Sequence, residues 1–237
     1  MPPFTRAALD ERPPEIAFVG DSAMAQFSLT VLKRAHQGPH RPFMFLTTQG
    51  CSPFMSAELS WCREVVSVLK HELAAPSLKT IVIASQWAHY FDNPMVVWRG
   101  EKVVPETGYG RDSLVEFKNW VAELSRTHSV IVVMNTPVGL EVDPRRMVHR
   151  RWWSNPVIDD APYPRAELEA FVQRANGAVR QAAFEGGASI IDPFDWLCDA
   201  SSCARAEAGF PLYRDTDHVR ATTLAARFRA FDALLDE

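Results

Sequence analysis

The sequence predicts an α/β domain with a parallel central sheet and helices on both faces of that sheet. Its 237 residues, 47% of them hydrophobic, are sufficient for one well-buried core. Short runs that are continuously apolar, as in strands buried on both faces, alternate with segments of helical periodicity. None of the apolar runs approaches the roughly 20 residues that a membrane span requires.

Five apolar runs rich in β-branched residues are predicted to be the strands. In chain order they are Ile16–Val19, Phe43–Thr47, Thr80–Ala84, Ser129–Asn135 and Ala188–Asp192. Alternation with helices favours parallel strands, whose carboxyl ends meet at one edge of the sheet and form the usual ligand site. The residues expected as neighbours along that edge are Ser22, Gly50, Gln86, Asn135 and Asp192.

Five segments with apolar residues at helical spacing are predicted to be the helices. They are Met24–Ala35, Trp61–Ala74, Leu114–Ser125, Ala166–Phe184 and Ala221–Leu235. Asp112 is expected to cap the third helix, and Gly186 with Gly187 to stop the fourth. Residues 1–14, which contain four prolines, are expected to be a linker remnant, and residues 15–237 a single domain.

Charge and cysteine content restrict the possible partners and cofactors. The formal net charge of −4 gives no electrostatic argument for binding nucleic acid. The N-terminal residues contain no apolar segment typical of a signal peptide. Cys51 lies close to Cys62, and Cys198 close to Cys203, which is compatible either with two disulfides or with four buried thiols. No CxxC or histidine pattern has ligand spacing, so we expect neither a metal nor a cofactor.

A serine directly after the first predicted strand is the candidate nucleophile. The strand runs into Gly20-Asp21-Ser22, which places Ser22 at a junction between strand and helix. Backbone amides at such a junction can stabilise an oxyanion, but the hydroxyl is a poor nucleophile without a base. The alternative is that Asp21 and Ser22 only cap the following helix.

A second motif near the C-terminus supplies a candidate base. In Asp215-Thr216-Asp217-His218, the first carboxylate can reach imidazole Nδ1 and leave Nε2 free to face a serine. The alternative is a solvated polar turn in which Asp217 caps the next helix. Because both motifs lie at junctions before helices, together they predict a catalytic triad of Ser22, Asp215 and His218.

Two long insertions, Tyr90–Tyr109 and Gly139–Pro164, interrupt the alternation of strands and helices. The second contains the adjacent basic and aromatic residues Arg150, Arg151, Trp152 and Trp153. Aromatic rings can pack on sugar faces and arginines can pair with acidic sugars, so this loop is a candidate acceptor site. The alternative is an amphipathic surface segment whose tryptophans pack into the core.

These motifs resemble the SGNH/GDSL hydrolase superfamily, and more narrowly the C-terminal SGNH domain of bacterial membrane acyltransferases that O-acetylate surface polysaccharides. The residues that carry the resemblance are Gly20-Asp21-Ser22, Gly50-Cys51-Ser52-Pro53, Trp87 with Tyr90, Thr136-Pro137, Asp192-Pro193, Leu197-Cys198 with Cys203, and Pro211-Leu212-Tyr213-Arg214-Asp215 with His218. They extend over almost the whole chain. The resemblance implies a three-layer α/β/α, flavodoxin-like fold around a parallel five-stranded sheet.

The resemblance also implies roles for individual residues. Ser22 would be the nucleophile, His218 the general base and Asp215 the residue that orients it. The disulfides would be Cys51–Cys62 and Cys198–Cys203.

The oxyanion hole departs from the pattern of the superfamily. The amides of Ser22 and Gly50 would form part of it, and the superfamily usually adds an Asn from a GxND block. Positions 84–87 read ASQW here, so Gln86 would be the substitute donor. Removing one oxyanion donor typically costs about 100- to 1,000-fold in kcat. Either Gln86 compensates, the hole has only two donors, or hydrolysis is slow, and slow hydrolysis suits a transferase that must keep water from its acyl-enzyme. Substrate contacts are expected from Trp87 and Tyr90.

The implied function is acyl-serine chemistry, with O-acetyl transfer to, or removal from, a bacterial cell-surface polysaccharide. The expected partners are an acetyl donor, a carbohydrate acceptor and an N-terminal membrane acyltransferase domain. The expected location is the periplasm or the extracytoplasmic face of the inner membrane. Two alternatives remain, a stand-alone SGNH carbohydrate esterase and a catalytically silent glycan-binding module of a membrane acyltransferase.

Overall fold

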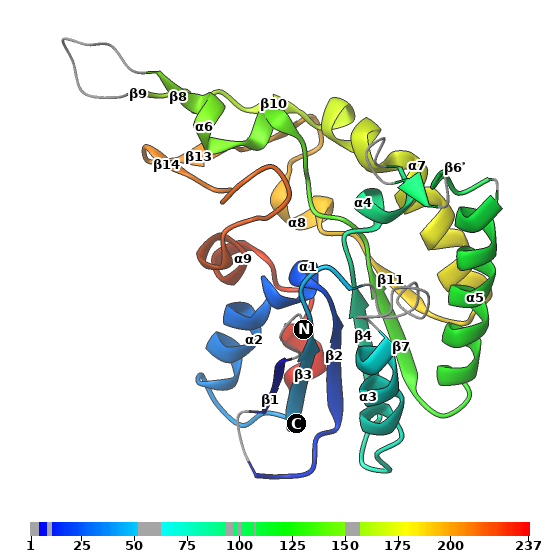
Figure 1. Cartoon of the computed structure of the whole chain (residues 1–237). Coiled ribbons are helices and arrows are strands. Elements are labelled where there is room, and N and C mark those ends of the chain that lie inside the picture. Colours follow the sequence, from blue (N-terminus) through cyan, green and yellow to red (C-terminus); the bar gives the residue numbers. More distant parts are fainter. Residues whose placement is uncertain are drawn as a thin grey trace.

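A six-stranded sheet, ordered β1-β3-β2-β4-β7-β11, forms the middle layer of the computed structural model (Figure 1). Five of its strands are parallel, as predicted: β2 (Ile16–Gly20), β3 (Phe43–Thr47), β4 (Thr80–Ala84), β7 (Ser129–Val133) and β11 (Ser189–Ile191). The structure describes residues 5–8, 11–51, 63–92, 97–98, 101–106, 108–149 and 157–237.

Helices cover both faces of this sheet, which explains why its strands are continuously apolar. Successive side chains of β2 point to opposite faces, so Ile16 and Phe18 join one core while Ala17 and Val19 join the other. The first core is closed by α2 (Ser28–Ala35), α9 (Ala221–Arg227) and α10 (Asp232–Leu235). The second is closed by α3 (Arg63–Leu73), α5 (Gly108–Leu124) and α7 (Arg165–Glu185). The α/β/α fold class is therefore confirmed.

The sixth strand, β1 (Thr5–Ala8), corrects the expected five-stranded sheet. It pairs antiparallel with β3 at the edge of the sheet, inside the stretch that the sequence assigns to a linker. All four of its residues, Thr-Arg-Ala-Ala, are exposed. Without a buried face, the strand needs no alternation of apolar and polar residues, and its sequence has none that could predict it. Backbone hydrogen bonding to β3, rather than side-chain burial, defines this strand.

Two predicted helices are each divided in the structure. The first consists of α1 (Ser22–Ala25) and α2, and the last consists of α9 and α10. Helix α5 begins at Gly108, so Asp112 lies within it and is not its N-cap. None of the described helices has the length and apolar character needed to cross a bilayer.

Short elements make up most of the remaining chain. The sequence did not predict the helical segments α4 (Trp87–Phe91), η2 (Leu140–Val142), α6 (Pro144–Met147) and α8 (Phe194–Leu197). The two-residue strands pair antiparallel as β5 (Val97–Trp98) with β6 (Glu101–Lys102), β8 (Val148–His149) with β9 (Val157–Ile158), β10 (Tyr163–Pro164) with β12 (Ser202–Cys203), and β13 (Ala206–Glu207) with β14 (Phe210–Pro211). The β8–β9 pair projects from the body of the domain (Figure 1).

A disulfide between Cys198 and Cys203 joins the end of α8 to β12. This is the pairing that the family resemblance implies. Cys51 is also disulfide-bonded, and its expected partner, Cys62, lies outside the described residues.

Gly20, the last residue of β2, allows the close approach of β4 next to the candidate site. A Cβ atom at this position would lie 1.8 Å from the carbonyl oxygen of Ala84. We expect Gly20→Ala to lower the free energy of unfolding by about 3 kcal/mol or more, because the backbone of β4 must shift. Gly38→Ala is the matched control, since a Cβ there meets no atom within 4 Å. Urea denaturation measures the stability of both variants. Equal midpoints for Gly20→Ala and Gly38→Ala would contradict the close packing of β2 on β4.

Candidate active site

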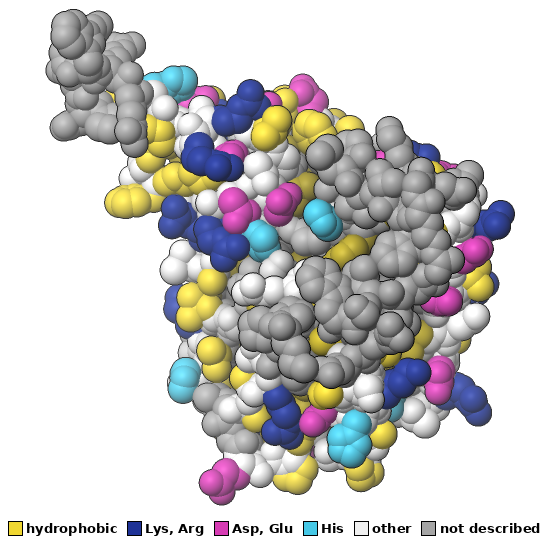
Figure 2. All heavy atoms as spheres, in the orientation of Figure 1, with side chains coloured by type: hydrophobic (Ala, Val, Ile, Leu, Met, Phe, Trp, Pro, Cys, Tyr) yellow, Lys and Arg dark blue, Asp and Glu magenta, His cyan; other side chains and the backbone are white. Residues whose placement is uncertain are grey.

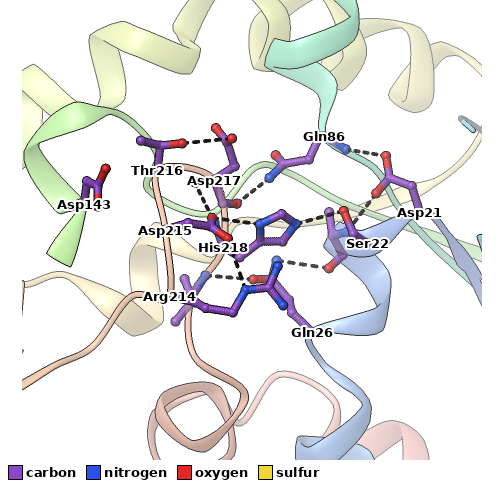
Figure 3. A network of polar contacts seen from close by, with 12 residues as sticks. Asp21, Ser22, Gln26, Gln86, Asp143, Arg214, Asp215, Thr216, Asp217 and His218 are labelled. Atoms are coloured by element: carbon purple, nitrogen blue, oxygen red, sulfur yellow. Dashed lines mark hydrogen bonds and ion pairs between the residues drawn. The ribbon is translucent and has the colours of Figure 1, made fainter. Parts of the chain in front are cut away.

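A hydrogen-bonded row of Ser22, His218 and Asp215 lies at the carboxyl end of β2 (Figure 3). Ser22 Oγ is 2.8 Å from His218 Nε2, although the two residues are 196 positions apart in the sequence. On the other side of the ring, His218 Nδ1 is 2.8 Å from Asp215 Oδ1. When Nδ1–H donates to the carboxylate, Nε2 is left to accept the serine proton. The geometry is therefore that of a nucleophile, a base and an orienting acid.

The Asp215 carboxylate is held by its own turn. Its Oδ1 accepts the backbone amides of Asp217 and His218, both at 2.9 Å, and its Oδ2 accepts Arg214 Nε at 3.1 Å. Burial raises the pKa of Asp215, but the hydrogen bonds from Asp217, His218 and Arg214 outweigh this effect and lower the pKa to about 2. Asp215 is thus anionic at neutral pH and can stabilise a protonated imidazole.

Asp21 fixes the start of α1, where Ser22 is the first residue. Its carboxylate accepts the amide of Ala23 at 2.8 Å, as an N-cap does, and the amide of Gln86 at 3.1 Å. The Tyr90 hydroxyl also bonds to this carboxylate. Burial raises the pKa of Asp21, and these hydrogen bonds oppose the rise. Asp21 therefore joins α1 to the end of β4, while the neighbouring Ser22 faces His218.

Two glutamines hold the peptide groups on either side of His218 (Figure 3). The side-chain amide of Gln86 donates to the carbonyl of Asp217, and Gln26 Oε1 accepts the amide of Val219 at 2.9 Å. Gln26 Nε2 in turn donates to the carbonyl of Ala23 in α1 at 3.1 Å. The His218 loop is thereby tied to the helix that starts at Ser22 and to the end of β4.

The orientation of the Gln86 amide is set by Asn135, which follows β7. Asn135 Nδ2 donates to Gln86 Oε1 at 2.6 Å, and Asn135 Oδ1 accepts the amide of Ala88 at 3.0 Å. The backbone N–H of Asn135 donates to Asn176 Oδ1 of α7 at 3.2 Å. One N–H of the Gln86 side chain is thus used on the His218 loop.

The other expected oxyanion donors lie at neighbouring strand ends. Gly50 follows β3 and Gln86 follows β4, on either side of the β2–Ser22 junction. Gly50 has φ of +67°, in the left-handed region that favours glycine. The rule that sites form at the carboxyl ends of parallel strands therefore places the predicted residues at one edge.

Of the expected substrate contacts, Trp87 is corrected by the structure. It is fully buried, donates its Nε1–H to the carbonyl of Val133 at 2.8 Å and packs against Phe117. As the first residue of α4, it lies in the core rather than in the site. Tyr90 is half-buried and its hydroxyl bonds to Asp21. The remaining candidates, Arg150, Arg151, Trp152 and Trp153, lie outside the described residues.

Gln26 is not among the residues that the sequence predicts for the site. It lies between α1 and α2, inside the stretch predicted as one continuous helix, where a glutamine looks like any polar surface residue. No local signal in the sequence marks it, because its partner Val219 lies 193 positions away.

A cavity of about 660 Å³ opens beside Ser22 and His218. Its walls include Thr48 and Gln49 after β3, and Arg214 and Arg220 from the C-terminal loop. Within the described part of the chain, no group of three or more His, Cys, Asp or Glu side chains is arranged to hold a metal ion. Because Ser22 and His218 both border the cavity, a molecule bound in it would lie next to the serine hydroxyl and the imidazole.

Replacing Gln86 with Met tests its contact with the His218 loop. The variant removes a buried hydrogen-bonded amide, so we expect a loss of about 1–3 kcal/mol in unfolding free energy. We also expect the low-field proton NMR signal of His218 Nδ1–H to broaden in the free protein. Gln37→Met, at an exposed residue, is the matched control. An unchanged His218 signal in Gln86→Met would contradict a role in positioning and favour an oxyanion role alone.

The low pKa of Asp215 predicts a specific pH dependence of stability. Because its folded-state pKa of about 2 lies below the ordinary value, its ionised form stabilises the fold at neutral pH. This contribution is lost as the pH falls from roughly 4 towards 2. The difference in unfolding free energy between wild type and Asp215→Asn should shrink only in that window. Urea titrations at stepped pH measure it, and shrinkage between pH 7 and 5 would contradict the assignment.

Comparisons with known proteins agree on the nature of the domain. The solved periplasmic domain of a lipopolysaccharide acetyltransferase from Salmonella ser. Paratyphi A is similar, with a TM-score of 0.61 and 15% identity over 95% of this chain and 84% of that chain. A Streptococcus pneumoniae protein provisionally described as a platelet activating factor gives a TM-score of 0.54 and 15% identity, over 95% of this chain and 86% of that chain. These likenesses concern the fold alone.

Among curated protein sequences, none matches this chain. The family model of the SGNH domain that is fused to AT3 domains matches residues 3–231. Because this match extends over nearly the whole chain, the protein belongs to the family of SGNH domains fused to AT3 domains.

Proposed function

We propose that this domain performs acyl-ester chemistry through an acyl-serine formed on Ser22. The observation that carries the proposal is the 2.8 Å contact between Ser22 Oγ and His218 Nε2, with Asp215 bonded to the far side of the ring. We further propose that the reaction is O-acetyl transfer to, or removal from, a bacterial cell-surface polysaccharide. Membership of a family fused to AT3 domains supports this reaction class.

In the first step, Ser22 Oγ attacks the carbonyl carbon of an acetyl ester while His218 Nε2 takes the serine proton. The amides of Ser22 and Gly50, with the second N–H of Gln86, stabilise the tetrahedral oxyanion. Collapse of this intermediate breaks the ester C–O bond. The leaving alcohol takes the proton from His218 and leaves an acetyl group on Ser22.

In the second step, a hydroxyl of the acceptor gives its proton to His218 and attacks the acetyl carbon. The bond to Ser22 Oγ breaks, and the proton on His218 returns to the serine. A carbohydrate hydroxyl in this step makes the domain a transferase, and water makes it an esterase. Asp215, ionised throughout, stabilises the imidazolium that forms in both steps.

The proposed setting is extracytoplasmic, next to a membrane acyltransferase domain of the AT3 type that supplies acetyl groups. The family description supports this partner, and the Cys198–Cys203 disulfide is typical of an oxidising compartment. The likeness to a domain described as periplasmic is consistent with the same location.

Labelling with a fluorophosphonate tests the acyl-serine directly. We expect wild type to be labelled on Ser22, and Ser22→Ala to abolish the labelling. Because the triad acts as a unit, both Ser22→Ala and His218→Ala should lower kcat/KM for p-nitrophenyl acetate by at least about 1,000-fold. Ser77→Ala, before β4 at the opposite end of the sheet, is the matched control.

Other outcomes of this experiment would favour the alternatives. Wild type that is neither labelled nor active would indicate a silent glycan-binding module and refute the proposal. Turnover of p-nitrophenyl acetate at the rate of a free lipase would favour a stand-alone esterase over a transferase.

A further inference from the structure

We infer that the cavity beside Ser22 binds an anionic group, a carboxylate or a phosphate, carried by the carbohydrate that accepts the acyl group. This inference rests on the proposed function and specifies the chemical class of its acceptor. The cavity has a volume of about 660 Å³ and is bordered by both Ser22 and His218. A group bound in it therefore lies next to the reacting atoms.

The described residues that line the cavity carry positive charge, although the protein as a whole has a negative formal charge. The chain has 29 acidic and 25 basic residues and a formal net charge of −4. The described residues that line the cavity nevertheless include Arg214 and Arg220, and no Asp or Glu. Over the region of α6 and α9, basic and acidic side chains lie side by side on this face (Figure 2). Arg214 is paired with Asp215, so Arg220 supplies the positive charge that favours an anion.

Both guanidinium groups are held at Nε, which leaves their outer nitrogen atoms for a ligand. Arg214 Nε donates to Asp215 Oδ2, and Arg220 Nε donates to the carbonyl of Tyr213, each at 3.1 Å. Arg220 forms no ion pair with any residue in the described part of the chain, so its charge is not compensated by a carboxylate there. A guanidinium presents two parallel N–H groups to carboxylate or phosphate oxygens, which is the contact these arginines can make.

The facing wall supplies neutral hydrogen-bonding groups from the segment after β3. Thr47, Thr48 and Gln49 line the cavity there. Thr48 is 4% exposed, and its hydroxyl has no hydrogen-bond partner within the described residues. Because this hydroxyl is buried, the exposed Gln49 is the residue of this wall that can offer a side-chain hydrogen bond to a ligand.

Arg220 is the residue whose replacement tests this inference most cleanly. Arg214 also bonds to Asp215, so changing it would disturb the proposed triad. Arg220→Gln keeps a polar side chain but removes the charge. Arg229→Gln is the matched control, because Arg229 is exposed, lies outside the cavity and donates to the carbonyl of Ala226.

Isothermal titration calorimetry of the whole chain with three sugars measures binding without requiring any reaction. Methyl glucuronide carries a carboxylate, glucose 6-phosphate carries a phosphate, and methyl glucoside is neutral. We expect at least one anionic sugar to bind about tenfold or more tightly than the neutral sugar, since hydrogen bonds between charged groups are stronger than neutral ones. This preference should be lost in Arg220→Gln and kept in Arg229→Gln.

The three affinities identify the recognised group or overturn the inference. The anionic sugar that binds more tightly identifies the carboxylate or the phosphate as the recognised group. Equal affinities for all three sugars, no measurable binding of either anionic sugar, or a preference unchanged in Arg220→Gln would overturn the inference. Fluorophosphonate labelling of Ser22 does not depend on sugar binding, so failure of this inference is distinguishable from failure of the proposed acyl-serine.

Discussion

The site depends on the hydrogen bonds that fix the loop carrying His218. Gln86 holds the peptide carbonyl before this residue, and Gln26 holds the peptide amide after it. The loop also closes on itself, because the amide of Arg214 donates to the carbonyl of His218 at 2.9 Å. Closure alone would fix the shape of the loop but not its place. The two glutamines, from opposite sides of Ser22, bring the imidazole to the serine.

The polar residues at the strand ends divide into two groups. Asp21, Gln86 and Asn135 are buried and use their side chains to join α1, β4, β7 and the C-terminal loop. Ser22 and His218 border the cavity instead. Because buried polar groups are costly unless they are paired, the first group specifies one arrangement of these elements. That arrangement holds Ser22 and His218 next to each other at the cavity.

Much of the sheet and of the site at its edge could be predicted from the sequence, because buried parallel strands are continuously apolar and their carboxyl ends share one edge. That rule placed Ser22, Gly50 and Gln86 together. It could not predict β1, whose four residues are exposed and carry no apolar pattern. It also could not predict the burial of Trp87, which depends on the direction in which α4 leaves the sheet. The contacts of Gln26 and Gln86 join distant segments, and their local sequence carries no signal of this.

Amide hydrogen exchange at Val219 tests most directly whether the loop is held in this way. The Val219 N–H donates to Gln26 Oε1, a contact between residues 193 positions apart. If the loop is anchored, this amide is protected in wild type. Gln26→Leu then removes the protection while the amides of β2 stay protected. Rapid exchange of Val219 in wild type, or equal protection in Gln26→Leu, would contradict the account.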